Sequence, residues 1–289
     1  MSVLPSEDRL KEAYALARPC RICPRLCKVD RLAGKEGFCG VGAVPIVSSA
    51  GPHYGEEPPL VGRGGSGTIF LAGCNLGCVF CQNYTISHER EGGPAGPDRI
   101  ARTMLLLEQR GCHNINFVTP THVTPWLMEA VRLARLDGLR IPIVYNCGGY
   151  ESLQTVRLLE GTVDIYMPDA KYWDSESARR YSGAPDYPEV MRVALKEMHR
   201  QVGDLQIVGG VARRGLLIRH LEMPNRVAGS RQVLEFIARE LSPHSYVNVM
   251  DQYRPTYRAH EFPEIARRPT YEEYEEARLY AQKLGLRLS

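Results

Sequence analysis

Short apolar runs alternate with longer amphipathic segments from residue 67 to the end of the chain. We expect strands at Thr68–Ala72, Asn114–Val118, Ile143–Tyr145, Val163–Met167, Gly215–Leu221 and Tyr246–Met250. The segments between these runs carry apolar residues at helical spacing. Strands that alternate with helices favour a parallel sheet with crossover connections. Six such repeats predict an α/β fold, a partial (β/α)6 TIM-like barrel.

Several helix ends carry recognisable signals. Glu7 to Ala17 has the pattern of a short helix. We expect Thr124 to cap a helix that begins at Pro125, and Ser230 to cap a second helix. Thr270 and Glu273 have the spacing of a capping box for the last helix.

Composition narrows the class of protein. The chain has 289 residues, of which 44% are apolar and 24% charged, and its net charge of +3 is too small to favour a nucleic-acid partner. No apolar run approaches the roughly 20 residues that span a bilayer, and the first residues lack a signal-peptide pattern, so we expect no membrane partner and a cytoplasmic location. In that reducing compartment, nine cysteines favour metal ligation over disulfides.

One cysteine group directly follows the first barrel strand. Cys74, Cys78 and Cys81 have C-x3-C-x2-C spacing, with Phe80 just before the last thiol. Three thiolates on one loop can take three irons of a cubane cluster and leave the fourth iron open. The alternatives are a zinc knuckle, which needs a fourth protein ligand close by, and three unrelated buried thiols.

A second group supplies four thiolates near the N-terminus. Cys20, Cys23, Cys27 and Cys39 have C-x2-C-x3-C-x11-C spacing, which suits tetrahedral zinc or a closed iron–sulfur cluster. A redox pair or thiols without a role are the alternative.

These groups predict a three-part organisation. We expect an N-terminal helix and small cysteine-rich metal-binding lobe at 1–41, a Gly/Pro-rich connecting loop at 42–66, and the barrel with its C-terminal helix at 67–289. His53, Glu56 and Glu57 lie in the predicted loop. They could line a site, but a solvated position is the expectation for each taken alone.

Unusual polar residues follow the other strands. They are Thr119, Thr121, Asn146, Asp169, Lys171, Arg219 and His220. Active sites of such barrels lie at the carboxyl ends of the strands. We therefore expect these side chains to share one face with the cysteine loop, His220 being the best histidine for a ligand contact.

The cysteine loop with its aromatic residue resembles that of the radical S-adenosylmethionine (SAM) superfamily. The stretches Cys20–Cys39, His53–Pro58, Gly73–Asn83, Asn114–Thr121, Asp164–Tyr172 and Arg219–Pro224 resemble a branch related to the pyruvate formate-lyase activating enzymes. The resemblance implies a [4Fe-4S] cluster on the three thiolates and SAM on the open iron.

The same resemblance implies the other SAM contacts. They would come from Phe80, Asn83, Asn146, Asp169, Lys171 and Arg219. Thr119 or Thr121 stands where the activating enzymes carry a glutamate for the amino group of SAM.

The resemblance implies reductive cleavage of SAM to a 5′-deoxyadenosyl radical. The first hypothesis for the substrate is a protein or peptide, with a flavodoxin or ferredoxin as reductant. A small-molecule substrate is the alternative within the same chemistry. A non-catalytic zinc-binding scaffold is the alternative from another class, and it predicts zinc without iron.

Overall fold

The computed structural model describes residues 4–289, so the first three residues of the predicted N-terminal lobe lie outside it. The strands are β1 (Ile46–His53), β2 (Ser66–Leu71), β3 (Gly93–Pro94), β4 (Ile115–Val118), β5 (Ile143–Cys147), β6 (Ile165–Pro168), β7 (Gln206–Val208), β8 (Val211–Leu221), β9 (Tyr246–Met250) and β10 (Arg287–Leu288). The helices are α1 (Glu7–Ala15), α2 (Pro58–Val61), α3 (Tyr84–Ser87), α4 (Pro97–Gln109), α5 (Thr124–Leu136), α6 (Leu153–Leu158), α7 (Ser175–Ser182), α8 (Tyr187–Val202), α9 (Ser230–Phe236) and α10 (Tyr271–Lys283).

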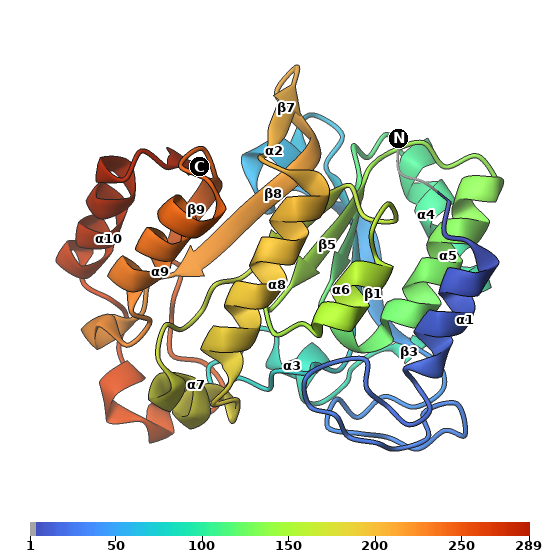
Figure 1. Ribbon diagram of the computed structural model, residues 1–289, viewed down its shortest axis with the longest axis horizontal. Helices are drawn as coiled ribbons and strands as arrows, with labels where there is room; N and C mark the ends of the chain where they lie inside the picture. The colour runs from blue at the N-terminus through green and yellow to red at the C-terminus, as the bar shows by residue number, and fades with distance from the viewer. Residues whose placement is uncertain (1–3) are drawn as a thin grey trace.

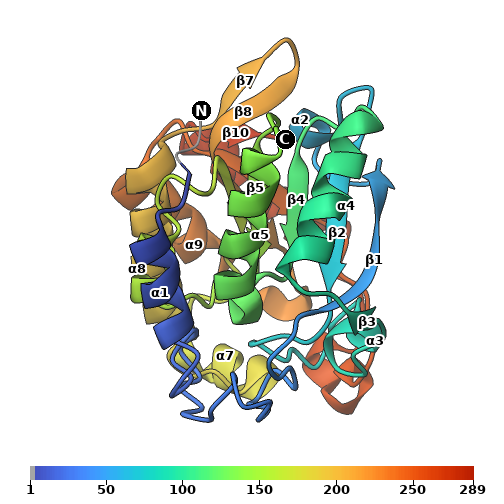
Figure 2. The ribbon, with the colours of Figure 1, turned by 90° about the vertical axis from the view of Figure 1, so that its right-hand side faces the viewer.

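The fold is an α/β arrangement around a mostly parallel sheet (Figure 1). Its strand order is β10-β9-β8-β6-β5-β4-β2-β1-β3, with β7 paired to β8. The six predicted strands are confirmed as β2, β4, β5, β6, β8 and β9, and neighbouring members of this set pair in parallel. Helices such as α4, α5 and α8 lie outside the strands (Figure 2). The chain therefore has the architecture of a TIM-like partial barrel.

The predicted connecting loop is partly wrong, because residues 46–53 form strand β1. This strand pairs with β2 in antiparallel register, from Val47 opposite Leu71 to His53 opposite Ser66. Its glycine and proline argue for a loop locally, but the edge of β2 supplies backbone partners that override that preference. The segment after β1 leads into α2, whose Leu60 is fully buried.

Side chains inside the barrel form distinct layers. Leu60, Val144, Leu217 and Tyr246 belong to one apolar cluster near the amino ends of the strands. Since side chains two positions apart on a strand point to the same side, Asn146, Arg219 and Asn248 follow Val144, Leu217 and Tyr246 on the same faces. The barrel is thus apolar at its amino end and polar towards its carboxyl end.

Two predicted helix caps are wrong and one is confirmed. Thr124 is already helical, and its hydroxyl donates to the Thr121 carbonyl at 3.0 Å instead of capping α5. Ser230 also lies inside its helix, where it contacts Glu222 and His220. In both cases buried polar groups nearby compete for the hydroxyl. Thr270 and Glu273 form the expected capping box of α10.

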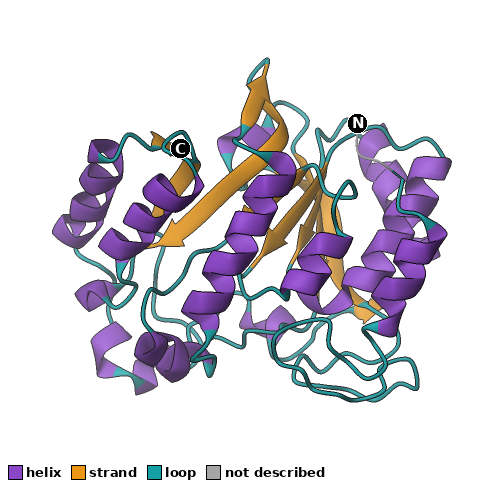
Figure 3. Ribbon diagram, viewed as in Figure 1, coloured by secondary structure: helices purple, strands orange, loops and turns teal. Residues whose placement is uncertain are grey.

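The N-terminal segment packs against the barrel. α1 covers the predicted Glu7–Ala17 helix nearly to its end and contacts α5 and α6. Residues 16–41 form turns without further helices or strands. The loops gather along the lower edge of the molecule, where the carboxyl ends of the parallel strands lie (Figure 3). The proposed boundaries at residues 41 and 66 stay a prediction.

Candidate active site

A cavity of about 300 Å³ opens at the carboxyl ends of the parallel strands. The predicted site residues that line it are Cys74, Cys78, Phe80, Cys81, Asn83, Thr119, Asn146, Asp169, Lys171 and Arg219. Each comes from the loop after a strand or from the strand end itself. The structure therefore brings together ten side chains from five separate segments of the sequence.

The cysteine loop after β2 forms one wall of this cavity. The Leu76 amide donates to Cys74 Sγ at 3.3 Å, and the Ser182 hydroxyl donates to Cys78 Sγ at 3.1 Å. Cys81 Sγ lies 3.0 Å from the Ser87 hydroxyl. Hydrogen bonds of this kind fix the sulfur positions and help to stabilise thiolates.

Burial controls the protonation of these thiols. It raises the pKa of Cys74 to about 12, and the neighbouring Cys78 adds to the increase. Burial also raises the pKa of Cys78, although Lys171 opposes it. Burial thus favours the protonated form of Cys74 and Cys78, and a metal must displace these protons on binding.

The three sulfurs fit a multinuclear group better than a single ion. Within residues 4–289, no three His, Cys, Asp or Glu side chains converge closely enough to hold one metal ion. In a cubane, each thiolate binds a different iron, so the sulfurs stay farther apart than around one ion. Cys74, Cys78 and Cys81 can thus hold a [4Fe-4S] cluster beside the cavity.

A largely buried ionic network forms another part of the wall. Asp169 contacts Lys171 at 2.6 Å and Arg219 at 2.8 Å, and Arg219 donates to Asn146 at 2.7 Å. Burial disfavours the Asp169 carboxylate, but Arg219 and Lys171 more than offset this effect and lower its pKa. The network keeps charged groups rigid at the cavity wall.

Strain and aromatic packing mark two other lining residues. Thr119 has a φ of 60°, in the left-handed region that a β-branched residue rarely adopts. Its amide donates to the Asn146 carbonyl at 2.9 Å. Strained backbone of this kind often lies at functional sites. Phe80 packs edge-on against Tyr172 and Tyr253, which fixes its ring beside the cysteines.

Two predicted contacts do not line the cavity. Thr121 is buried, and its hydroxyl donates to Glu151 at 2.6 Å. His220 is fully buried on the opposite face of β8 from Arg219, since adjacent strand residues alternate. Its ring nitrogens lie 2.6 Å from the Ala170 carbonyl and 2.7 Å from the Ser230 hydroxyl. His220 is therefore a structural residue of the barrel wall.

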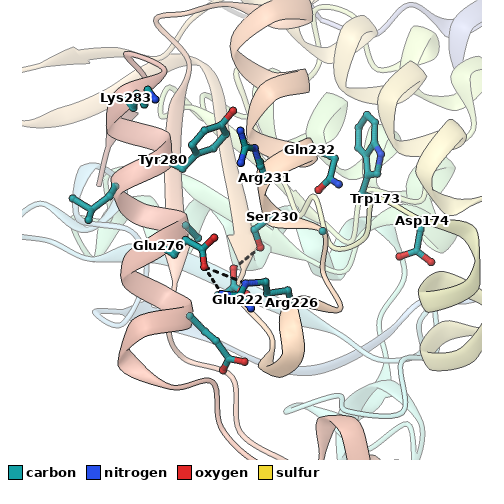
Figure 4. Close-up of a pocket in the computed structure, with 14 residues that line it drawn as sticks. Trp173, Asp174, Glu222, Arg226, Ser230, Arg231, Gln232, Glu276, Tyr280 and Lys283 are labelled. Atoms are coloured by element: carbon teal, nitrogen blue, oxygen red, sulfur yellow. Dashed lines mark hydrogen bonds and ion pairs between the residues drawn. The ribbon is translucent and has the colours of Figure 1, made fainter.

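The His220 network reaches a second cavity of about 620 Å³ beside α9 and α10 (Figure 4). Ser230 and Glu222 contact each other at its base, and Arg226 pairs with Glu276 at 2.6 Å. No member of the cysteine loop lines this cavity, so it is separate from the site at the strand ends.

For the acidic pair that precedes α2, the sequence favours a solvated loop over a place in a site. Glu57 is 7% exposed and accepts two hydrogen bonds of 2.9 Å from Asn248 of β9. Glu56 lies near Arg219 and His53. A prediction of solvated side chains is thus wrong for Glu57. The buried helix that follows the pair was the available signal.

The four N-terminal cysteines lie close to one another. Burial raises the pKa of Cys23, and the thiolates of Cys39, Cys20 and Cys27 add to the increase. The Phe38 amide donates to Cys27 Sγ at 3.3 Å. Within the described residues, their sulfurs do not converge closely enough to hold a single metal ion.

A parallel partial barrel with a thiol-lined cavity at its strand ends defines the class of an iron–sulfur enzyme. Residues 68–209 match the model of the Radical SAM superfamily. The chain belongs to this superfamily, whose members use a [4Fe-4S] cluster and SAM.

Two relatives from Methanocaldococcus jannaschii are similar to the chain. "Uncharacterized protein MJ0674" is 33% identical over 97% of this chain and 79% of its own length. "Uncharacterized protein MJ0808" is 24% identical over 53% of this chain and 52% of its own length.

The crystal structure of methylornithine synthase (PylB) has a similar fold. Its TM-score is 0.51 at 13% identity, and the match covers 98% of this chain and 71% of that one. Within residues 4–289, none of the helices combines the length and apolar composition needed to cross a membrane.

Proposed function

We propose that Cys74, Cys78 and Cys81 hold the [4Fe-4S] cluster and that the adjoining cavity binds SAM. The observation that carries this proposal is the shared cavity, which three thiols line together with the Asp169–Arg219 pair. When bound, the cluster supplies one electron that cleaves SAM to methionine and a 5′-deoxyadenosyl radical, which then takes a hydrogen atom from the substrate.

The protein's own residues position SAM and exclude water in this proposal. Phe80 is held by Tyr172 and Tyr253 and shields the cluster side of the cavity. Asp169, Lys171, Arg219 and Asn146 offer polar groups for the methionine and ribose parts of SAM, and Thr119 and Asn83 line the remaining wall. Their mutual hydrogen bonds fix these groups before SAM binds.

We further propose a protein or peptide substrate, as in the activating enzymes that the sequence resembles. Two exposed aromatic residues flank the cysteine loop. Phe38 is 52% exposed beside Gly77, and Tyr257 is 38% exposed and stacks on His88. Exposed aromatic groups beside the cysteine loop suit a macromolecular partner. A flavodoxin or ferredoxin would dock on the same surface to deliver the electron.

One observation favours the small-molecule alternative. The amino end of the barrel is closed by the buried Leu60 and its apolar neighbours, which leaves a cavity of only about 300 Å³. The N-terminal cysteines would hold zinc or an auxiliary cluster under either alternative.

The decisive experiment measures iron, sulfide and 5′-deoxyadenosine in protein purified without oxygen, with reductant and SAM added. Cys74→Ala, Cys78→Ala and Cys81→Ala should each lose the cluster and SAM cleavage. Cys112→Ala is the matched control, because Cys112 is buried away from the cavity in another cluster of side chains. Full iron and full activity in any of the three variants would refute the assignment.

A further inference from the structure

The cavity beside α9 and α10 has no role in the proposed SAM chemistry. Its volume of about 620 Å³ lies in the range of small-molecule sites. Leu221, the last residue of β8, lines the SAM cavity, whereas Glu222, the next residue along the chain, lines the cavity beside α10. The two cavities thus lie close along the chain but are formed by different side chains.

A buried carboxyl group lies at the base of this cavity (Figure 4). Glu222 is 1% exposed and contacts the Ser230 hydroxyl. Arg226 lines the same cavity, but its guanidinium is 2.6 Å from the carboxylate of Glu276. Within residues 4–289, Glu222 itself forms no ion pair. A buried carboxylate without a cation beside it is costly, so its ionised form favours a positively charged ligand.

Two acceptors compete for one proton when Glu222 is ionised. His220 Nδ1 donates to the Ala170 carbonyl at 2.6 Å, and burial lowers the pKa of His220 to about 4, so the neutral ring accepts at Nε2. Ser230 lies 2.7 Å from this Nε2 and has a single O–H, which cannot serve both His220 and the Glu222 carboxylate. The ionised network therefore lacks one donor, and a ligand in the cavity can supply it.

The charges that line the cavity also favour a cation. They are four carboxylates, Asp174, Glu222, Glu273 and Glu276, and three cations, Arg226, Arg231 and Lys283. Asp174 and Lys283 are exposed to solvent, and Glu273 and Arg231 have partners outside the cavity lining, Arg267 at 2.8 Å and Glu235 at 3.6 Å. Ionised Glu222 is thus the buried charge that this set leaves unbalanced. Because burial raises the pKa of Glu222 to about 7, the ionised form is accessible near neutral pH.

The walls around Glu222 are largely apolar. Trp173 and Tyr280 lie on either side of Ser230 (Figure 4), and Ala277 and Leu279 of α10 also line the cavity. Apolar walls around a polar base suit a ligand with an apolar body and one polar end. Aromatic rings in the wall favour an aromatic body.

We infer that this cavity binds a primary amine with an aromatic body, whose ammonium group donates to Glu222. The ammonium group supplies both the positive charge and the N–H that the ionised network lacks. The inference goes beyond the proposed function, since it assigns a ligand to a cavity that the cysteine loop does not line. The same chemistry occurs in a free amine and at the amino terminus of a peptide that begins with an aromatic residue.

The test uses cluster-loaded protein without oxygen and without SAM. The probes are 2-phenylethylamine, its neutral counterpart 2-phenylethanol, and phenylalanylglycinamide. Thermal unfolding midpoints over a range of probe concentrations give the affinities. We expect 2-phenylethylamine to bind at least tenfold more tightly than 2-phenylethanol at neutral pH. Tighter binding of phenylalanylglycinamide than of 2-phenylethylamine would assign a peptide source, and the reverse order a free amine.

Two variants and a control locate the bound probes. Glu222→Gln should weaken binding of 2-phenylethylamine at least tenfold and leave that of 2-phenylethanol unchanged, because it removes the charge and keeps the shape. Trp173→Leu should weaken binding of both probes, because it removes part of the apolar wall. Glu91→Gln, a change at an exposed glutamate outside the cavity, should bind both probes as the unmodified protein does.

Any of four results would overturn the inference. They are equal binding of the amine and the alcohol, no binding of either amine, unchanged amine affinity in Glu222→Gln, and undiminished binding of both probes in Trp173→Leu. The last result would place the probes outside this cavity. Because the test measures binding without SAM, a failure of the proposed function, which is absence of SAM cleavage, is recognised separately.

Discussion

Glu222 should make the stability of this protein depend on pH, and a count of protons in its network shows why. The Ala170 carbonyl can only accept, so the His220 Nδ1 2.6 Å away carries a proton. Burial lowers the pKa of His220 to about 4, so its Nε2 accepts from the Ser230 hydroxyl at 2.7 Å. Ser230 then has no proton left for Glu222, which it also contacts. With this arrangement of protons, only the neutral form of Glu222 can donate to Ser230, so the network favours that form.

The size of the effect follows from the pKa of Glu222. Burial raises it from 4.5 to about 7. Because one pKa unit corresponds to about 1.4 kcal/mol, ionising Glu222 in the folded protein costs about 3 kcal/mol. A raised pKa means that this stability is fully present below pH 4.5 and is lost as the pH rises through about 7.

Glu222→Gln isolates this contribution. The glutamine amide can donate to Ser230 at every pH, so the network persists without a titrating group. Urea unfolding of the cluster-loaded protein at pH 5 and pH 8 gives the free energies of unfolding. We expect the variant to gain about 2–3 kcal/mol relative to the unmodified protein over this range. Glu151, whose pKa burial also raises to about 7, is present in both proteins and cancels. A difference that does not change with pH, or that favours the unmodified protein at pH 8, would refute the reasoning.

Three further predictions concern the proposed sites. Asp169→Asn leaves Lys171 and Arg219 without their carboxylate partner. We expect the free energy of unfolding to fall by about 3–5 kcal/mol and the SAM affinity, measured by equilibrium dialysis, to fall at least tenfold. Unchanged SAM affinity would contradict the role of the network. Thr119→Gly relieves a positive φ and should raise the free energy of unfolding by about 1 kcal/mol, whereas a lower value would show that the side chain stabilises this turn. Cys27→Ala should lose either zinc or about four irons in metal analysis while the other cluster remains, and an unchanged metal content would exclude an N-terminal metal site.

The sequence predicts those parts of the fold and site that depend on local signals. Apolar runs of strand length located all six parallel strands within a few residues. Because parallel strands end at one edge, residues such as Asp169 and Arg219 could be assigned to the same cavity as the cysteine loop. Thiol spacing alone marked the loop itself.

Other parts depend on contacts between distant segments. Residues 46–53 form a strand because they pair with β2. Glu57 can be buried because Asn248 of β9 donates hydrogen bonds to its carboxylate. The position of His220 shows a second limit of prediction from sequence. It follows Arg219 directly, yet the alternation of strand side chains sends it away from the cavity. An exact register was needed to separate these two neighbours.

Arg25 determines how short a working version of this protein can be. Its guanidinium donates to the carbonyls of Asn75 and Leu76 in the cysteine loop, and to those of Ser182 and Gly183 at the end of α7. The region that matches the superfamily starts only at residue 68, so an expression fragment cut to that region would lack this brace. Ser182, which also holds Cys78, would lose a partner at the same time. A minimal fragment for cluster assembly therefore has to begin ahead of residue 25.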